Sequence, residues 1–254
     1  MRAFLVGLQF LTRISLVRQD EWDVRDFGRS VKFFPLIGAV LGAIYAAAAY
    51  GLFIFLPGRG ITVPHHFAAA LLLVLPPLMT GGLHCDGFMD TMDGVFSGRS
   101  RERMLEIMKD SCAGSNAVFC FVSLMLFEFA VLLDMAPTLC VPALFVMPVI
   151  ARMMMTAGIT LYPYARPEGM GKAFAEYADK KSFAFAMTST LVLVLPFGVS
   201  AWTALAVSAA FTTFFAGYVE KRLGGLTGDV YGAIVTLNEG LTLLVFLAAS
   251  MLLA

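Results

Sequence analysis

The sequence predicts an all-α integral membrane protein, on the strength of its composition, its hydropathy and the length of its apolar runs. The chain has 254 residues, of which 59% are hydrophobic and 14% are charged. A soluble domain has about 45–50% apolar and about 25% charged residues. The mean hydropathy is +0.81, and the apolar residues gather in long runs near the roughly 20 residues that cross a bilayer as a helix. We therefore expect one polytopic membrane domain over residues 1–254.

About seven runs are long enough to be transmembrane helices. Residues 115–160 and 183–219 are nearly continuous apolar runs, each too long for one span. We divide them at 134–138 and at 198–202. The predicted spans are 34–56, 66–82, 115–136, 138–160, 183–199, 202–219 and 231–253.

Two further segments have the pattern of amphipathic helices at the membrane surface. The N-terminal run MRAFLVGLQFLTRISLV is interrupted by Arg13 and lacks a small-residue cleavage site, so it favours an interfacial helix over a signal peptide. In residues 101–109, Met104, Ile107 and Met108 recur at helical spacing between charged residues. This spacing predicts a second surface helix.

Lysine and arginine alternate between the two sides of the predicted bundle. Residues 1–33 carry six, and the connections that follow carry one, four, none, four, none, two and none, with Arg152 inside a span. Positive residues are enriched in cytoplasmic loops. We expect a cytoplasmic N-terminus, and we expect residues 83–114, 161–182 and 218–230 to meet on the cytoplasmic face.

The stretch HCDGFMDTMDG, residues 84–94, places three carboxylates beside a predicted span. On a helix with about 100° per residue, Asp90 lies about 40° from Asp86, and Asp93 about 20° to its other side. Like charges on one face repel unless a cation lies among them, and carboxylate oxygens suit Mg²⁺ together with substrate phosphates. We expect Asp86, Asp90 and Asp93 to be metal ligands and catalytic groups; the alternative is a solvated helix cap.

His84 and the residues that follow the cluster have weaker signals. His84 lies about 160° from the aspartate face if the helix includes it, so a catalytic and a structural role are equally open. Lys109 could contact a phosphate, or it could belong to an ordinary positive-inside loop. Asp110 is a candidate ligand for a metal or a hydroxyl group.

Two glycine-bearing loops share the predicted cytoplasmic face. YARPEGMGKAF, residues 164–174, carries Arg166 and Lys172, two cations that suit a phosphate-rich ligand, although an ordinary turn explains the pattern equally well. GGLTGDVYGA, residues 224–233, carries Thr227 and Asp229. It lacks the Lys-Ser/Thr ending of a P-loop, and Asp229 could simply cap the last helix.

Arg152 and Glu239 are ionisable residues within predicted spans. Each lies about nine residues from the cytoplasmic end, or about 13 Å deep. Because such residues usually face a cavity or one another, we expect either an ion pair or a polar cavity beneath the aspartates.

The charge balance and the cysteines exclude other classes of site. Eighteen basic and eighteen acidic residues give a net charge of zero, which argues against a nucleic-acid partner. The four cysteines form no C-x-x-C pair, so we predict neither a disulfide framework nor a zinc site.

Several separated motifs resemble the cobalamin synthase family, the adenosylcobinamide-GDP ribazoletransferases. GGLHCDGFMDTMDGVFSG followed by LEIMKDS resembles the family signature. The stretches LQFLTRISL, FFPLIGAVLG, YARPEGMGKAF and GGLTGDVYGA, with Glu239 downstream, resemble the family in the same order. The resemblance covers essentially the whole chain.

The resemblance implies a magnesium-dependent enzyme of the bacterial or archaeal inner membrane. The implied reaction transfers the adenosylcobinamide-phosphate moiety of adenosylcobinamide-GDP to α-ribazole or α-ribazole 5′-phosphate, giving adenosylcobalamin or its 5′-phosphate and GMP. A ribazole hydroxyl would attack the cobinamide-side phosphorus, and one carboxylate or His84 would take its proton. The resemblance also implies substrate-binding positions. These are Arg13, Lys109, Asp110, Arg152, Arg166, Lys172, Thr227, Asp229 and Glu239.

The chain departs from the family pattern at two cysteines. Cys85 stands at a position that is often acidic or apolar in the family, and Cys112 replaces an expected arginine. These changes put substrate contacts in doubt more than the class of reaction. The sequence leaves the oligomeric state open, whether a homo-oligomer or a complex with other corrinoid-pathway enzymes.

Two other functions are weighed against this one. A CDP-alcohol phosphatidyltransferase would need D-G-x-x-A-R, but Asp86-Gly87 is followed by Phe88-Met89-Asp90-Thr91. A membrane transporter would place polar residues at the midplane of paired halves; here no internal repeat is seen, and the polar motifs gather at one edge.

Overall fold

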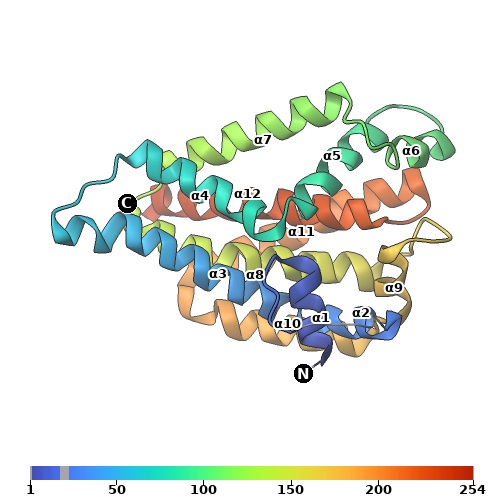
Figure 1. Cartoon of the computed structure of the whole chain (residues 1–254), viewed down its shortest axis with the longest axis horizontal. Helices are drawn as coiled ribbons and strands as arrows, with labels where there is room; N and C mark the ends of the chain where they lie inside the picture. The colour runs from blue at the N-terminus through green and yellow to red at the C-terminus, as the bar shows by residue number, and fades with distance from the viewer. Residues whose placement is uncertain (1, 18–22, 254) are drawn as a thin grey trace.

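The computed structural model describes residues 2–17 and 23–253, and these form a bundle of helices (Figure 1). Arg18, one of the six N-terminal cations counted above, lies outside the described residues. The helices are α1 (Arg2–Leu11), α2 (Val24–Ser30), α3 (Phe34–Tyr50), α4 (His65–Thr80), α5 (Leu83–Val95), α6 (Arg101–Ile107), α7 (Ser115–Asp134), α8 (Pro137–Leu161), α9 (Met170–Tyr177), α10 (Lys180–Val194), α11 (Gly198–Leu223) and α12 (Gly228–Leu253). The expected all-α membrane class is confirmed.

Five stretches of the described chain are long and apolar enough to cross a membrane, fewer than the seven predicted. They are Val24–Arg59, Ser115–Asp134, Pro137–Leu161, Lys180–Leu223 and Gly228–Leu252. α4 and α5 together would make a sixth, bent by 91°. The remaining difference arises because 183–199 and 202–219, predicted as two spans, fall within the single stretch Lys180–Leu223.

That stretch of 44 residues is too long for one crossing. At 1.5 Å per residue it would measure about 66 Å, more than twice the roughly 30 Å of a hydrocarbon core. A short 3₁₀ turn over Leu195–Phe197 and Gly198, with φ +69°, interrupt it. Figure 1 shows α10 and α11 running in opposite directions on either side of this break. The two predicted spans therefore correspond to two helices joined by a tight reversal.

α8 is the central helix of the bundle. Every side chain from Val146 to Thr156 is buried, and α8 packs against α3, α10, α11 and α12. α7 instead packs against α4, α5 and α12 and exposes apolar side chains such as Phe119 and Leu126. This is the pattern of a helix that faces lipid, where exposed apolar side chains are expected.

A double-glycine turn separates α4 from α5. Gly81 and Gly82 both adopt left-handed conformations, with φ of +64° and +76°, which only glycine adopts readily. Gly81 ends α4 as a left-handed cap, the usual way in which a helix stops at glycine. α5 can therefore start at a steep angle to α4 and carry the aspartates across the end of the bundle.

Three connections gather at one end of the bundle, which we call the loop end. Tyr164 and Leu226 form an isolated parallel β-bridge: the Ala165 amide donates to the Leu226 carbonyl at 2.8 Å, and the Leu226 amide donates to the Pro163 carbonyl at 2.8 Å. The Arg101 side chain donates to the carbonyls of Leu223 and Ala165 at 2.6 and 3.3 Å. The loop end is thus made of residues 96–114, 162–179 and 224–227, so the three polar segments meet as expected.

Candidate active site

Asp86 and Asp90 come close to Asp229 because α5 crosses α12 at a contact between glycines. A Cβ atom on Gly87 would lie 2.7 Å from the Asp229 carbonyl oxygen, and one on Gly232 would lie 3.2 Å from the His84 carbonyl oxygen. Only glycine permits this approach of two backbones. The crossing brings the carboxylates of α5 to the first turn of α12.

Among the residues that the structure describes, Arg166 is the cation in direct contact with the carboxylates at this crossing. The carboxylate of Asp90 experiences repulsion from Asp229, Asp86 and Asp93 and attraction from Arg166. Arg166 Nη2 lies 2.8 Å from Asp229 Oδ2, and the Thr227 hydroxyl donates to the same oxygen at 3.2 Å. The β-bridge between the two loops is what carries Arg166 to this position. The result is an acidic site with a guanidinium at its edge.

Asp93 lies on the same helix but uses its carboxylate differently. Its two oxygens accept the amides of Gly114 and Ala117, the second at 2.9 Å. Asp93 therefore caps the N-terminus of α7, where a negative charge is favourable. Within residues 2–17 and 23–253, no three His, Cys, Asp or Glu side chains form a ready-made metal cluster.

A cavity of about 220 Å³ opens beside Asp86 and Asp229. We call it the main cavity. Its lining is Phe10, Leu83, His84, Asp86, Gly87, Met155, Tyr164, Arg166, Gly169, Met170, Gly171, Phe174, Gly228, Asp229, Tyr231 and Gly232. Burial raises the pKa of Tyr164 above its usual value, although Arg166 opposes this shift, so its phenol stays protonated and can donate a hydrogen bond. The main cavity therefore joins an acidic edge to an aromatic and sulfur-containing wall.

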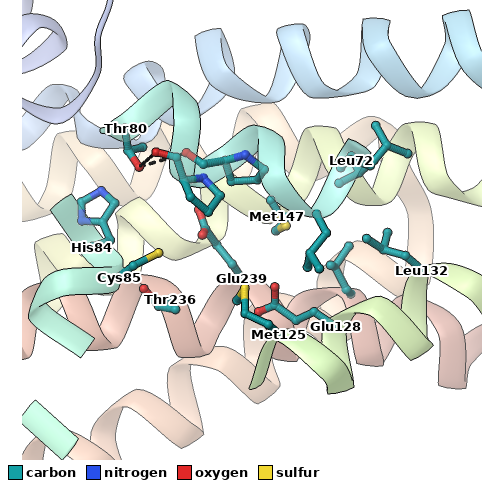
Figure 2. A pocket seen from close by; sticks show the side chains of 15 residues that line it. Leu72, Thr80, His84, Cys85, Met125, Glu128, Leu132, Met147, Thr236 and Glu239 are labelled. Carbon is teal, nitrogen blue, oxygen red and sulfur yellow. Dashed lines mark hydrogen bonds between the residues drawn. The ribbon is translucent and has the colours of Figure 1, made fainter. Parts of the chain in front are cut away.

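A second, buried cavity of about 20 Å³ lies deeper in the bundle and has room for about one water molecule. Figure 2 shows His84, Glu128 and Glu239 among the side chains that line it. Arg152, which is fully buried, forms an ion pair with Glu239. Of the two expectations for Arg152 and Glu239, the ion pair is therefore found, and Glu239 also lines this small cavity, whose wall is mostly apolar.

His84 connects the two cavities, because it lines both. It is 3% exposed, and within the described part of the chain its Nε2 atom has no hydrogen-bond partner. His84 belongs to α5 and is buried where Asp86 is exposed. The two residues nevertheless line the same cavity, although the angle of about 160° between them on the helix predicted that a helical His84 would lie away from the aspartates.

Of the nine predicted substrate-binding residues, only Arg166 and Asp229 belong to the lining of the main cavity. Arg152, Thr227 and Glu239 have the partners described above, and the other four line neither of the two cavities. Arg13 is exposed and packs beside Gly81, at the turn between α4 and α5. Lys109 is exposed at the end of α6, and Asp110 accepts the Cys112 amide at 3.0 Å. Lys172 donates to the Pro167 carbonyl at 2.7 Å. Their roles in binding remain predictions.

Sequence reasoning missed several residues that the fold brings to the two cavities. Glu128 was assigned no role, yet it is 8% exposed and lines the deeper cavity beside Glu239. The rule that intramembrane carboxylates face a partner would have paired them. Phe10, Tyr164, Phe174 and Tyr231 line the main cavity, but an aromatic residue in an apolar chain has no distinguishing signal.

Comparison with known proteins shows the family of the chain. The family model for cobalamin-5-phosphate synthase matches residues 3–247. Relatives named adenosylcobinamide-GDP ribazoletransferase include those of Desulfitobacterium hafniense (37% identical, covering 96% of each chain), Clostridium acetobutylicum (33%, covering 94% of this chain and 92% of the relative) and Pseudomonas aeruginosa (36%, covering 94% and 95%). No solved structure matches. The chain belongs to the cobalamin-5-phosphate synthase family.

Proposed function

We propose that this chain is an adenosylcobinamide-GDP ribazoletransferase. It joins adenosylcobinamide-GDP to α-ribazole or its 5′-phosphate and releases GMP. Relatives with this name match nearly the full length of both chains. The observation that carries the proposal is the main cavity, where Asp86, Asp229 and Arg166 from three distant segments share one lining.

The proposed reaction is an in-line displacement at phosphorus. A ribazole hydroxyl oxygen forms a bond to the cobinamide-side phosphorus, and the bond from that phosphorus to the oxygen bridging to GMP breaks. The bonding electrons leave with GMP, and the hydroxyl proton passes to a carboxylate or to His84. Arg166 lies at the acidic edge, where its planar guanidinium can donate two parallel hydrogen bonds to phosphate oxygens.

We propose that Mg²⁺ is the cofactor, held chiefly by Asp86 and Asp90, with Asp229 opposite them. The donors fit this ion because they are carboxylate oxygens. The carboxylates also repel one another, so a cation bound between them would be favourable. Mg²⁺ commonly binds through one or two carboxylates, water and substrate phosphates, so it needs no complete protein cage. When bound, it would neutralise the charge that develops on the pyrophosphate.

We propose that the loop end faces the cytoplasm of a bacterial cell and that the bundle crosses the inner membrane. The alternation of lysine and arginine supports this orientation. A cytoplasmic site suits the substrates, because a GDP conjugate and a ribazole phosphate are charged and do not cross a bilayer unaided.

The test is GMP release from adenosylcobinamide-GDP and α-ribazole by membranes that contain the protein. Asp86→Asn and Asp90→Asn keep the side-chain shape and remove the charge. Each should lower turnover by at least about a hundredfold, because a lost metal ligand costs several kcal/mol and each ~1.4 kcal/mol is tenfold in rate. Raised magnesium or manganese should restore part of the activity.

Asp134→Asn is the matched control, because Asp134 is exposed at the opposite end of α7. It should leave turnover and magnesium dependence unchanged. Near wild-type rates in both Asp86→Asn and Asp90→Asn would contradict the magnesium site. A wild-type protein that releases no GMP would contradict the proposed function itself.

A further inference from the structure

The lining of the main cavity divides by chemistry into acidic or basic groups and an apolar wall. The polar groups take part in the proposed reaction, but the apolar wall has no role in it. Phe174 is its best-anchored member. Its ring centroid lies 5.2 Å from that of Phe10, 5.6 Å from that of Phe27 and 5.6 Å from that of Phe34. Side chains from α1, α2 and α3 therefore hold this ring in place.

Two sulfur-containing side chains, Met155 and Met170, line the same cavity as Phe10 and Phe174. Thioether sulfur makes favourable contacts with aromatic rings and adapts to their shape. A wall of phenylalanine and methionine is suited to a flat, apolar, aromatic group. It is poorly suited to a charged or strongly hydrogen-bonding one.

Tyr231 also belongs to the lining of the main cavity, and it carries a buried hydroxyl group. The residue is 1% exposed, and its hydroxyl has no hydrogen-bond partner among the residues that the structure describes. Its ring lies 6.4 Å from that of Tyr164, and it also lines the main cavity. Because buried hydroxyl groups in proteins are nearly always hydrogen-bonded, an unpartnered one in a cavity lining points to a ligand atom as its partner.

Size and polarity decide which part of the two substrates fits. The cavity volume of about 220 Å³ is below the roughly 300–1,000 Å³ of pockets for drug-sized ligands, so a corrin macrocycle is far too large. Guanine carries several donors and acceptors that the apolar wall would leave unpaired, which disfavours its binding there. The dimethylbenzimidazole of α-ribazole is flat and apolar, and it has one unsubstituted ring nitrogen that accepts a hydrogen bond.

We propose that the main cavity binds the base of α-ribazole. The ring packs against Phe10 and Phe174, and its free nitrogen accepts a hydrogen bond from the Tyr231 hydroxyl. The ribose then points toward Asp86 and Arg166, and the corrin ring stays outside. This inference rests on the proposed function and extends it by assigning the residues that select the lower-ligand base.

The decisive experiment pairs one enzyme variant with one substrate analogue. Tyr231→Phe removes only the hydroxyl, and dimethylindole riboside replaces only the free ring nitrogen of α-ribazole with C–H. Wild-type protein should use α-ribazole more efficiently than the indole by roughly two- to thirteenfold in kcat/KM, the value of one neutral hydrogen bond of 0.5–1.5 kcal/mol. Tyr231→Phe should treat the two substrates alike, and KM for adenosylcobinamide-GDP should not change.

A second variant tests the aromatic wall. Phe174→Leu should raise KM for α-ribazole and weaken the preference for benzimidazole over smaller or more polar bases. Phe185→Leu is its control, because Phe185 is 44% exposed on α10 and lies outside the cavity lining. It should leave KM for both substrates unchanged.

Two results would overturn the inference. If Tyr231→Phe still preferred α-ribazole to its indole analogue as strongly as the wild type does, Tyr231 would not donate the proposed hydrogen bond. A raised KM for adenosylcobinamide-GDP alone, in either variant, would assign the cavity to guanine instead. Failure of the proposed function is a separate result, namely no GMP release by the wild type. In that case equilibrium binding of labelled α-ribazole and GMP to the detergent-solubilised wild type and Tyr231→Phe decides which base the cavity takes.

Discussion

Asp86, Asp90 and Asp93 share one helix, but their carboxylates do different things. Asp86 is exposed beside the main cavity, and Asp90 faces the charges of Asp86 and Asp229. Asp93 accepts two amides at the start of α7. Each oxygen of Asp93 keeps a lone pair, yet its hydrogen bonds already explain its position. Asp93 thus has the helix-cap role that the sequence left open, and the proposed metal role falls to Asp86 and Asp90.

Asp93→Asn should therefore affect stability more than metal binding. An amide side chain has one acceptor oxygen, so one of the two amides of α7 loses its partner, at a cost of about 0.5–2 kcal/mol. We expect a lower unfolding temperature in detergent and an unchanged magnesium concentration for half-maximal activity. A magnesium requirement raised as much as in Asp86→Asn would instead make Asp93 a ligand.

The buried ion pair between Arg152 and Glu239 predicts a second effect at the residue scale. Arg152→Met leaves Glu239 without its partner, which should lower the free energy of unfolding by about 3–5 kcal/mol. The double variant Arg152→Met with Glu239→Gln removes both charges and should recover much of this loss. Thermal unfolding of the wild type, the single variant and the double variant in detergent measures these differences in stability. Equal stability of the single and double variants would show that the charges do not act as a pair.

Sequence reasoning could foresee the contact between Arg152 and Glu239, because both lie about nine residues from the same side of the membrane and an intramembrane charge needs a partner. It could not foresee the pair of Arg166 with Asp229. That pair depends on the backbone bridge between Tyr164 and Leu226, which joins segments of ordinary turn composition. Hydrogen bonds between such loops leave no periodic pattern in the sequence.

At the scale of elements, the crossing of α5 and α12 is what assembles the acidic site. Gly87→Ala would place a methyl group 2.7 Å from the Asp229 carbonyl oxygen and force the two helices apart. We expect a loss of stability of about 1–3 kcal/mol, typical of overpacking. We also expect a marked loss of GMP release, because Asp86 and Asp90 move away from Asp229.

Gly217→Ala is the matched control for this substitution. Gly217 also lies within a helix, and a Cβ atom there meets nothing within 4 Å. Alanine should stabilise α11 by about 0.5–1 kcal/mol, because glycine is the weaker helix former. Activity should be unchanged. If Gly87→Ala behaved in the same way, the close crossing would not be needed for the site.

The elements themselves were largely predictable, because hydropathy reports what each stretch of chain must bury. The break between α10 and α11 lies at 195–198, a few residues before the 198–202 that the sequence suggested, and Gly198 is common to both. The 91° bend between α4 and α5 was not foreseen. Two glycines in a row mark a turn, but the angle depends on the packing of α5 against α7 and α12.

At the scale of the whole molecule, three loops meet at one end, and we propose from the charge pattern that this end faces the cytoplasm. Single cysteines in a cysteine-free background test this. Gly98, Glu168 and Lys221 are exposed at or next to the loop end, and Gly60 is exposed in the connection from α3 to α4. A membrane-impermeant thiol reagent added to intact cells should label Gly60→Cys and miss the other three. External labelling of Glu168→Cys would show that the topology is the reverse of the proposed one.

The Arg152–Glu239 pair also has a consequence for how the protein is made. An arginine at the centre of an isolated helix costs about 2.5–3.5 kcal/mol on insertion into a bilayer. Glu239 follows 87 residues later in the chain, so at 5–20 residues per second it emerges roughly 4 to 17 s after Arg152. During that interval α8 carries an uncompensated charge and is best kept beside the insertion machinery. The charge of Arg152 is therefore compensated only once α12 has been made, and a chain that is truncated before α12 should be degraded by quality-control proteases.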